Sequence, residues 1–428
     1  MKQQLKDIIL ENQQFNPGTI IKRDYMHIPL NTGMIISIMG ARRSGKTFLL
    51  YYLITKLKKE GLPVENIVFI NFEDERLNLK STDLDLILQA YQELFPDTDI
   101  KNTCFFFDEI QNVNGWEKFI RRVYDTKSKN LFVTGSNSRL LSTEIATELR
   151  GRTVSYTIYP FSFNEFVKAK NGPDNHSTQT NRAKLITLAE QFMFEGGFPE
   201  LTRFDRPFKI KILQEYFNVM IYRDIIERYT ISNPEVLKYF IKKIFSAVTG
   251  PLSVNKAYND LKSMGYKVSN KYLYEYLHYC NSVFLTQSIN KFDFSEIKQA
   301  KSDKKVYIID NGLLNAIDFH VSENRGKLLE NMVAMEFLKQ GKKLFYYKDQ
   351  TECDFIVQEE RGNLIPVQVS LSLRETSTRL RETKGLINAC NYIGVKNGTI
   401  ITFDEEETIS ESSCKINAIP FYRYFRQC

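Results

Sequence analysis

The chain has 428 residues, more than one hydrophobic core usually serves, so we expect two or three domains. Its composition, 43% hydrophobic and 25% charged residues, excludes a mainly disordered protein. The net charge of +7, from 58 basic and 51 acidic residues, is a weak indication of a polyanionic partner.

Two classes of protein are excluded by simple patterns. The six cysteines are scattered and lack CxxC spacing, so neither a zinc site nor a disulfide framework is expected. The sequence contains no run of about 18 apolar residues, and its first residues have no sustained apolar core. We therefore expect a cytoplasmic protein that does not contact a membrane.

The first predicted element is an apolar strand over residues 34–39, followed by a glycine-rich loop and a helix over residues 47–59. This order is the context of a P-loop, in which backbone N–H groups surround a polyphosphate. We expect Lys46 to reach the terminal phosphates and the Thr47 hydroxyl to ligate Mg²⁺. A chance match in a glycine turn is the alternative. The predicted nucleotide-binding residues here are Gly40, Ala41, Arg42, Arg43, Ser44, Gly45, Lys46, Thr47 and Phe48.

Two adjacent acids follow the apolar run 104–107, which is typical of a central parallel strand that is buried on both faces. Parallel α/β sheets bind ligands at the carboxyl ends of their strands, where Asp108 and Glu109 are expected to lie. A nucleotide hydrolase needs a carboxylate for its metal ion and a base for the attacking water. We assign these roles to Asp108 and Glu109 respectively. An acidic helix cap after a core strand is the alternative.

The next predicted strand, at residues 131–135, ends in small polar side chains. Ser136 or Asn137 is expected to orient water against the γ-phosphate. A helix over 138–149 and an alternating strand over 153–159 follow, with arginines between them. Arg152 is our first candidate for an arginine finger that acts in trans in a ring, and Arg150 is the second. The alternative role is an arginine that offsets the dipole at a helix C-terminus.

Residues 166–230 are predicted to be helical, apart from a polar loop at 171–180, and to form a lid over the nucleotide. Residues 238–271 then contain seven lysines and one acid, Asp260, which gives an excess of six positive charges. Helices are expected over 253–264 and 269–280 around a short turn. Strands over 283–291 and 304–310, with a polar loop at 292–303, complete the pattern of a winged helix.

The second of these helices has one apolar face, which leaves Asn270, Lys271, Tyr274 and His278 pointing outward. The first three are the candidates for contact with double-stranded DNA. A winged helix that binds protein or serves as a lid is the alternative.

Five motifs, in their order along the chain, resemble those of archaeal and bacterial AAA+ superfamily ATPases that carry a C-terminal nuclease-like domain. These motifs are GARRSGKT at 40–47, DEIQ at 108–111, TGS at 134–136, LRGR at 149–152 and GGFPE at 196–200. The resemblance extends over nearly the whole chain. It implies an ATP-binding AAA+ core, a short helical lid, a winged-helix segment and a degenerate restriction-endonuclease-like fold.

A metal-dependent nuclease of the PD-(D/E)XK type needs a glutamate on a helix, an aspartate at a strand end, and an acid-X-lysine on the next strand. Glu330 on a helix over 328–340 and Asp354 after a strand over 346–353 fit this frame. Gln368, on a strand over 364–370, replaces the acid, and its amide oxygen can still ligate a metal ion.

The lysine of this frame is missing, because Ser370 occupies its position. Cleavage would need a substitute cation, such as Lys384 or Arg381 from the following helix. Our interpretation is a weak or inactive nuclease fold that serves binding or assembly. Active cleavage and a merely acidic surface strand are the alternatives.

We therefore predict an α/β protein with four parts. They are a P-loop NTPase (AAA+) parallel sheet in residues 1–165, a helical lid in 166–230, a winged helix in 231–312 and a smaller α/β restriction-endonuclease-like domain in 313–428. The predicted reaction is Mg²⁺-dependent ATP hydrolysis, coupled to binding or remodelling of double-stranded DNA, by a chain that forms homo-oligomers if Arg152 acts in trans. A nucleotide-gated nuclease and an ATP-driven signalling or assembly switch that binds protein are the alternatives.

Overall fold

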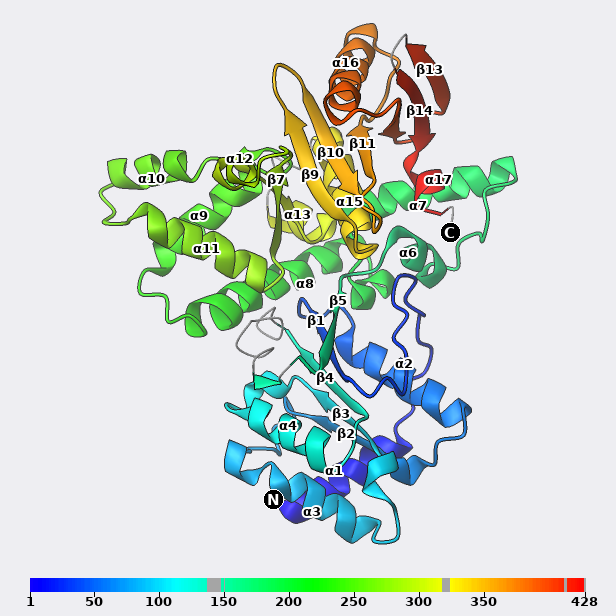
Figure 1. The fold of residues 1–428 in the computed structure, drawn as a ribbon, viewed down its shortest axis with the longest axis vertical. Coiled ribbons are helices and arrows are strands. Elements are labelled where there is room, and N and C mark those ends of the chain that lie inside the picture. The colour runs from blue at the N-terminus through cyan, green and yellow to red at the C-terminus, as the bar shows by residue number, and fades with distance from the viewer. Residues whose placement is uncertain (137–147, 150, 318–323, 412–413, 427–428) are drawn as a thin grey trace. The chain divides into compact units, whose positions relative to one another are not determined.

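The computed structural model describes residues 1–136, 148–149, 151–317, 324–411 and 414–426. It divides into two compact units, Met1–Tyr159 and Pro160–Cys428, which are described separately (Figure 1). Among the described residues, no helix is both long and apolar enough to cross a lipid bilayer.

The first unit is built on a five-stranded sheet in the order β2–β3–β4–β1–β5, in which every neighbouring pair is parallel. The parallel sheet predicted from the apolar runs is therefore confirmed. Its strands are β1 (Ile35–Gly40), β2 (Ile67–Asn71), β3 (Cys104–Asp108), β4 (Leu131–Gly135) and β5 (Thr153–Ile158).

Helices cover both faces of this sheet because successive side chains of β3 point to opposite sides. Phe106 stacks on Phe132 in the core cluster beneath α2 (Lys46–Lys59). Phe105 and Phe107 face the other way, toward α3 (Asp85–Leu94) and α4 (Trp116–Thr126), where they contact Tyr91 and Phe119. Helix α1 (Lys2–Gln14) packs beside α3 and β2. The unit is thus a three-layer α/β sandwich (Figure 1).

The second unit begins with helices, as predicted for residues 166–230. They are α6 (Phe163–Ala169), α7 (Gln179–Glu195), the 3₁₀ turn η6 (Pro199–Arg203), α8 (Arg206–Val219) and the π-helical turn η7 (Met220–Glu227). The turn after α7 needs glycine, since a Cβ atom at Gly196 would lie 2.0 Å from Asp310 Oδ1. Gly197 N–H donates to Asp310 Oδ2 at 2.6 Å, so this carboxylate fixes the turn.

A helix-turn-helix follows, and its two predicted helices are confirmed. The elements are α9 (Pro234–Ser246), β6 (Pro251–Leu252), α10 (Val254–Ser263), α11 (Asn270–Ser282), β7 (Thr286–Lys291), α12 (Glu296–Lys301) and β8 (Lys304–Ile308). The prediction of a polar loop at 292–303 was wrong in part, because this segment contains α12. Asp293 lies just before the helix: its carboxylate accepts the Ser295 N–H, and its carbonyl accepts the Gln299 side-chain amide.

One mixed sheet of nine strands runs through the rest of the unit, in the order β13–β14–β12–β11–β10–β9–β7–β8–β6. The added strands are β9 (Lys343–Lys348), β10 (Glu352–Gln358), β11 (Leu364–Val369), β12 (Asn397–Thr402), β13 (Glu407–Glu411) and β14 (Cys414–Pro420). Strands β7 and β9 pair in parallel, so the strands of the helix-turn-helix segment continue into the C-terminal strands. The predicted boundary between residues 312 and 313 lies between β8 and β9 in the sequence, and both strands belong to this one sheet. The four-part division stays a prediction.

This region also contains the helices α13 (Asn311–Ile317), α15 (Arg325–Lys339) and α16 (Thr376–Ile393). The predicted strand over 346–353 was wrong in its extent. A polar turn interrupts it, in which Asp349 N–H donates to Thr351 O at 2.9 Å, so β9 ends before it and β10 begins after it. Asp354 consequently lies within β10 rather than after a strand. The chain ends in the short helix α17 (Phe421–Tyr424).

Candidate functional site

The glycine-rich loop connects the end of β1 to the start of α2, as expected for a P-loop. Gly40 packs so closely on β5 that an added Cβ atom would lie 2.0 Å from Ile158 O. Arg43 and Gly45 have positive φ angles of 63° and 100°, and they turn the backbone before the helix begins. The loop conformation therefore depends on glycine at both of its ends.

Lys46 lies over this loop and is only 4% exposed. Its ammonium group donates to Gly40 O and Ala41 O, both at 3.2 Å, and forms an ion pair with Glu109 Oε1 at 3.0 Å. The lysine and the predicted catalytic base are thus direct partners in the nucleotide-free chain.

Asp108 is buried and accepts hydrogen bonds from two threonine side chains. Its Oδ2 accepts from the Thr47 hydroxyl at 2.7 Å, and its Oδ1 accepts from the Thr134 hydroxyl at 2.5 Å. Thr134 Oγ1 in turn accepts the Glu109 N–H at 2.9 Å. The structure therefore joins the P-loop, β3 and β4 through one chain of hydrogen bonds, which brings the predicted metal ligands Thr47 and Asp108 together.

The two acids have opposite pKa shifts. Burial, helped by the negative charge of Glu109, raises the pKa of Asp108 to about 6. Burial would also raise the pKa of Glu109, but the charge of Lys46 and the hydrogen bond from Gln111 outweigh it and lower this pKa. The backbone of Glu109 has a positive φ of 54°, which is uncommon for a residue with a side chain.

Two buried hydroxyl groups at this edge have no hydrogen-bond partner among the described residues: Ser44 Oγ in the loop and Ser136 Oγ after β4. Such groups are costly unless a ligand or water satisfies them. Asn137, the other predicted sensor, lies outside the described residues. Arg42 pairs with Glu73 at 2.9 Å, and Phe48 is half exposed on α2.

Arg152 takes part in an ion pair within its own chain. Its guanidinium contacts Asp125 of α4 and lies 5.3 Å from the ring centroid of Tyr124. The role of arginine finger stays a prediction for Arg152, and Arg150 lies outside the described residues.

The predicted DNA-contacting residues lie on the outer face of α11. Tyr274 is 55% exposed, and the Lys271 side chain is 85% exposed. Asn270 instead donates its side-chain amide to Asn255 Oδ1 at 3.0 Å, which ties α11 to α10. Acidic neighbours pair with some of the surrounding lysines, as in Lys243 with Asp260 at 2.8 Å.

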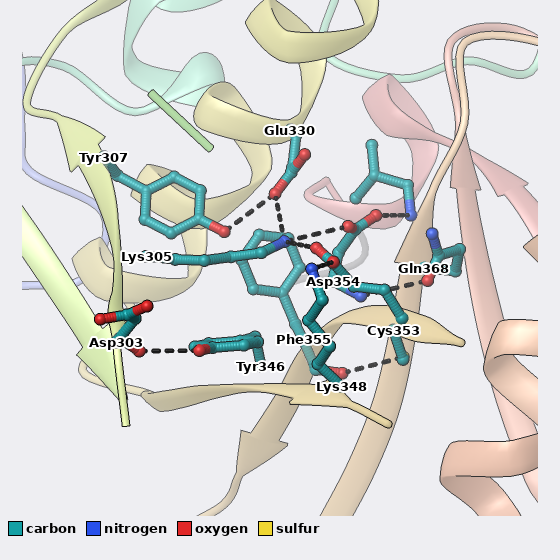
Figure 2. Close-up of polar contacts among 12 residues, drawn as sticks. Asp303, Lys305, Tyr307, Glu330, Tyr346, Lys348, Cys353, Asp354, Phe355 and Gln368 are labelled. Atoms are coloured by element: carbon teal, nitrogen blue, oxygen red, sulfur yellow. Dashed lines mark hydrogen bonds and ion pairs between the residues drawn. The ribbon is translucent and has the colours of Figure 1, made fainter. Parts of the chain in front are cut away.

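The structure brings the three nuclease-like candidates together (Figure 2). Glu330 comes from α15, Asp354 from β10 and Gln368 from β11. Asp354 N–H donates to Gln368 Oε1 at 3.1 Å, and Asp354 Oδ2 accepts the Val369 N–H at 3.0 Å. These residues line one end of a cavity of about 710 Å³, the C-terminal cavity, between α15, β10, β11 and α16.

The cation of this cluster is Lys305 of β8, a residue that sequence reasoning missed. Its Nζ lies 3.2 Å from Glu330 Oε1 and 3.4 Å from Asp354 Oδ1 (Figure 2). It also lies 2.6 Å from Glu352 Oε1. Of the two substitute cations named from the sequence, Arg381 pairs with Glu382 at 2.6 Å, and Lys384 lines the same cavity. A role for either in cleavage stays a prediction.

The charges of this cluster influence one another strongly. Burial, together with the charge of Glu330, raises the pKa of Asp354 to about 8. Burial also raises the pKa of Glu330, although Lys305 opposes it. Burial would lower the pKa of Lys305, but Glu330 and the other neighbouring anions raise it well above its ordinary value. Lys305 is therefore a buried ammonium ion.

Family models match three consecutive segments of the chain. An AAA domain matches residues 32–167, and two domains of unknown function, DUF8612 and DUF4143, match residues 186–324 and 325–424. Uncharacterized protein MJ1544 of Methanocaldococcus jannaschii is 35% identical over 435 residues, covering 98% of this chain and 94% of that protein. The chain belongs to the family of MJ1544.

An uncharacterized protein of Haemophilus influenzae is 33% identical to this chain over 359 residues. The match covers 84% of this chain and 87% of that protein. Among solved structures, the Orc1 protein of Aeropyrum pernix in complex with DNA covers 76% of this chain and 93% of its own, at 12% identity and a TM-score of 0.30. That score supports no argument about function. The AAA domain and the parallel sheet make the first unit of this MJ1544-family protein a P-loop NTPase domain.

Proposed function

We propose that this protein binds ATP with Mg²⁺ at the P-loop and hydrolyses it. One observation carries the proposal: hydrogen bonds and an ion pair join Lys46, Thr47, Asp108 and Glu109 at the carboxyl edge of the parallel sheet. A cation for the phosphates, two oxygen ligands for the metal ion and a base for water are thus within one site.

The residues fit a magnesium ion. Thr47 and Asp108 offer a hydroxyl and a carboxylate oxygen, the hard ligands that Mg²⁺ prefers, and their oxygens are already 2.7 Å apart. Thr134 holds the other Asp108 oxygen and so fixes the orientation of the carboxylate. Bound Mg²⁺ would neutralise the charge that develops on the phosphate oxygens.

The ion pair between Lys46 and Glu109 makes the base depend on nucleotide binding. In this structure the ammonium of Lys46 lowers the pKa of Glu109, because an opposite charge stabilises the carboxylate form. The terminal phosphates compete for the same ammonium, and their binding frees Glu109 to accept a proton from the attacking water. Ser136, whose buried hydroxyl has no partner among the described residues, is placed to orient that water.

Two variants test the proposal. K46A should lose tight ATP binding in calorimetry, because it removes the ammonium group that is proposed to reach the terminal phosphates. E109Q should bind ATP at least as tightly as wild type, since its amide no longer competes for Lys46, but should not release phosphate. K59A, at an exposed lysine of the same helix, is the matched control and should behave as wild type.

Each variant can contradict a different part of the proposal. Unchanged phosphate release by E109Q removes Glu109 as the base, while leaving the binding site intact. Unchanged ATP affinity in K46A removes the site itself.

The second candidate function is DNA binding by the helix-turn-helix segment. We infer that α10 and α11, with the antiparallel strands β7 and β8, form a winged helix in which α11 faces the DNA. Its support is the exposed Lys271 and the lysine-rich composition around it. Such contacts are mainly to phosphates and give affinity that falls with salt.

A salt titration tests this function. Replacing exposed Lys267 and Lys271 by alanine should flatten the slope of log affinity against log salt by about one per lysine. K298A, at an exposed lysine of α12, is the control. If wild type binds no duplex DNA at low salt, DNA binding is excluded, and protein binding becomes the proposed function of this segment.

We also infer that α15, β9 to β12 and α16 form a restriction-endonuclease-like fold. It is supported by Glu330 on the helix and by the hydrogen-bonded Asp354 and Gln368 on neighbouring strands. Because β11 carries Ser370 at the lysine position, we expect this fold to serve binding or assembly rather than cleavage.

A further inference from the structure

We propose that the ammonium group of Lys305 takes the place of a divalent metal ion in the C-terminal cluster. The cluster is then a latent metal site, which the native lysine keeps closed. This proposal goes beyond the ATPase and does not depend on it.

The first support is the position of the ammonium. Carboxylate oxygens of Glu330, Glu352 and Asp354 converge on Lys305 Nζ within 3.4 Å, from two different elements of the fold. An ammonium group has three donors, and here three carboxyl oxygens lie within reach of them. Converging carboxylate oxygens are also what a hard divalent cation needs. The lysine therefore uses the ligands that a metal ion would use.

The spacing of these oxygens suits nitrogen better than metal. Contacts of 2.6 to 3.4 Å exceed the 2.0–2.1 Å that Mg²⁺ requires. Accordingly, within the described ranges no group of three His, Cys, Asp or Glu side chains is placed to hold a metal ion. The carboxylates would have to close in after removal of the ammonium.

Two further oxygen atoms beside the ammonium already accept hydrogen bonds from backbone N–H groups. Asp354 Oδ2 accepts the Val369 N–H, and Gln368 Oε1 accepts the Asp354 N–H. The amide nitrogen of Gln368 donates to Glu382 Oε2 at 2.5 Å, which fixes the amide orientation. Gln368 thus stabilises the cluster and does not offer a free ligand.

Lys305 is held in this position by its strand. Backbone pairing on both sides of β8 joins it to β6 and β7, and the side chain is 1% exposed. The ring of Tyr346 lies 5.6 Å from Nζ, and Tyr307 shares Glu330 with the lysine through a 2.9 Å hydrogen bond. Swinging the ammonium into solvent would deprive these acidic side chains of the cation that they share, which is strongly unfavourable for buried charges.

The test compares wild type with K305M, in which methionine keeps the length of the side chain and removes its charge. Nucleotide-free protein is titrated with Mn²⁺, followed by electron paramagnetic resonance of the bound ion and by thermal unfolding. We expect K305M to bind one Mn²⁺ that wild type does not bind. The bound ion should raise the unfolding midpoint of K305M by about 5 °C at 100-fold excess over its dissociation constant.

The double variant K305M/E330Q is the control for location, since it lacks one of the proposed ligands, and it should lose the gained Mn²⁺ site. Three outcomes overturn the proposal: K305M shows no Mn²⁺ gain, K305M stays unfolded even with Mn²⁺, or the double variant keeps the gained site. A fourth is wild type that binds Mn²⁺ and loses it in D354N, because the native lysine would then coexist with the metal ion. Mn²⁺-dependent DNA cleavage by wild type that disappears in K305M would likewise assign the lysine to catalysis instead.

Discussion

Replacing Asp108 by asparagine should stabilise the nucleotide-free protein, because the folded site disfavours the charge of this carboxylate. Its pKa rises from an ordinary value of 3.8 to about 6 on folding. One pKa unit corresponds to about 1.4 kcal/mol, so keeping Asp108 ionised costs about 3 kcal/mol of folding free energy at pH 7. The asparagine side chain retains the shape and can still accept from Thr134, while its amide donates to the Thr47 hydroxyl.

The stability advantage of D108N over wild type should depend on pH. The folded protein holds the proton on Asp108 more tightly than the unfolded chain does. The contribution of this carboxyl group to stability is therefore full below pH 3.8 and is lost as the pH rises through 6. D108N carries no charge at any pH, so its advantage over wild type should be near zero around pH 4 and reach about 3 kcal/mol at about pH 7.

Trp116 makes the measurement specific to the first unit. It is the single tryptophan of the chain, lies on α4 and is 2% exposed. Denaturant unfolding followed by its fluorescence, at several pH values between about 4 and 7, gives the free energy of unfolding for each variant. D97N, at an exposed aspartate, should match wild type throughout. Parallel stability curves for D108N and wild type across this pH range would refute the reasoning.

Two further predictions concern the same unit. G40A should prevent correct pairing of β1 with β5 and so lower the yield of folded protein, because its Cβ atom would lie 2.0 Å from Ile158 O. G61A is the control: its φ is also positive, at 93°, so alanine strains the backbone there, but the added Cβ meets open space. This variant should fold and bind ATP, as purification and calorimetry will show. R152A should lower stability by less than about 1 kcal/mol, since its pair with Asp125 is partly exposed, and should leave the affinity for ATP unchanged. Loss of phosphate release in R152A without a change in melting temperature would show that the arginine acts in turnover, whereas a large loss of stability would contradict the surface-pair account.

The nucleotide site was readable from the sequence because its parts follow from local patterns. A buried apolar run predicts a parallel strand, and the residues that follow such strands meet at one edge of the sheet. This rule placed Lys46 and Asp108 together before any coordinates. It did not identify Thr134, because a threonine inside a buried run gives no sign of its neighbour. Thr134 lies beside Asp108 because Phe107 pairs with Val133, and local sequence does not determine the register between two strands.

The C-terminal cluster shows where pattern reasoning ends. Glu330 and Asp354 fitted a known frame, and the missing lysine was sought nearby in the sequence. The cation of the cluster, Lys305, lies 25 residues before Glu330, in a segment that was predicted only to be a strand. Local sequence can predict that β8 exists and which of its side chains share a face. It cannot predict that β7 will pair with β9 and carry β8 to the acids.

The shared sheet has a practical consequence for anyone dissecting this protein. A fragment cut at the family boundary before residue 325 would keep Glu330, Glu352 and Asp354 but leave Lys305 behind. It would also expose the edge of β9 that pairs with β7, and such an exposed edge promotes aggregation through strand pairing. The two domains of unknown function are best expressed, mutated and compared among relatives as one inseparable block.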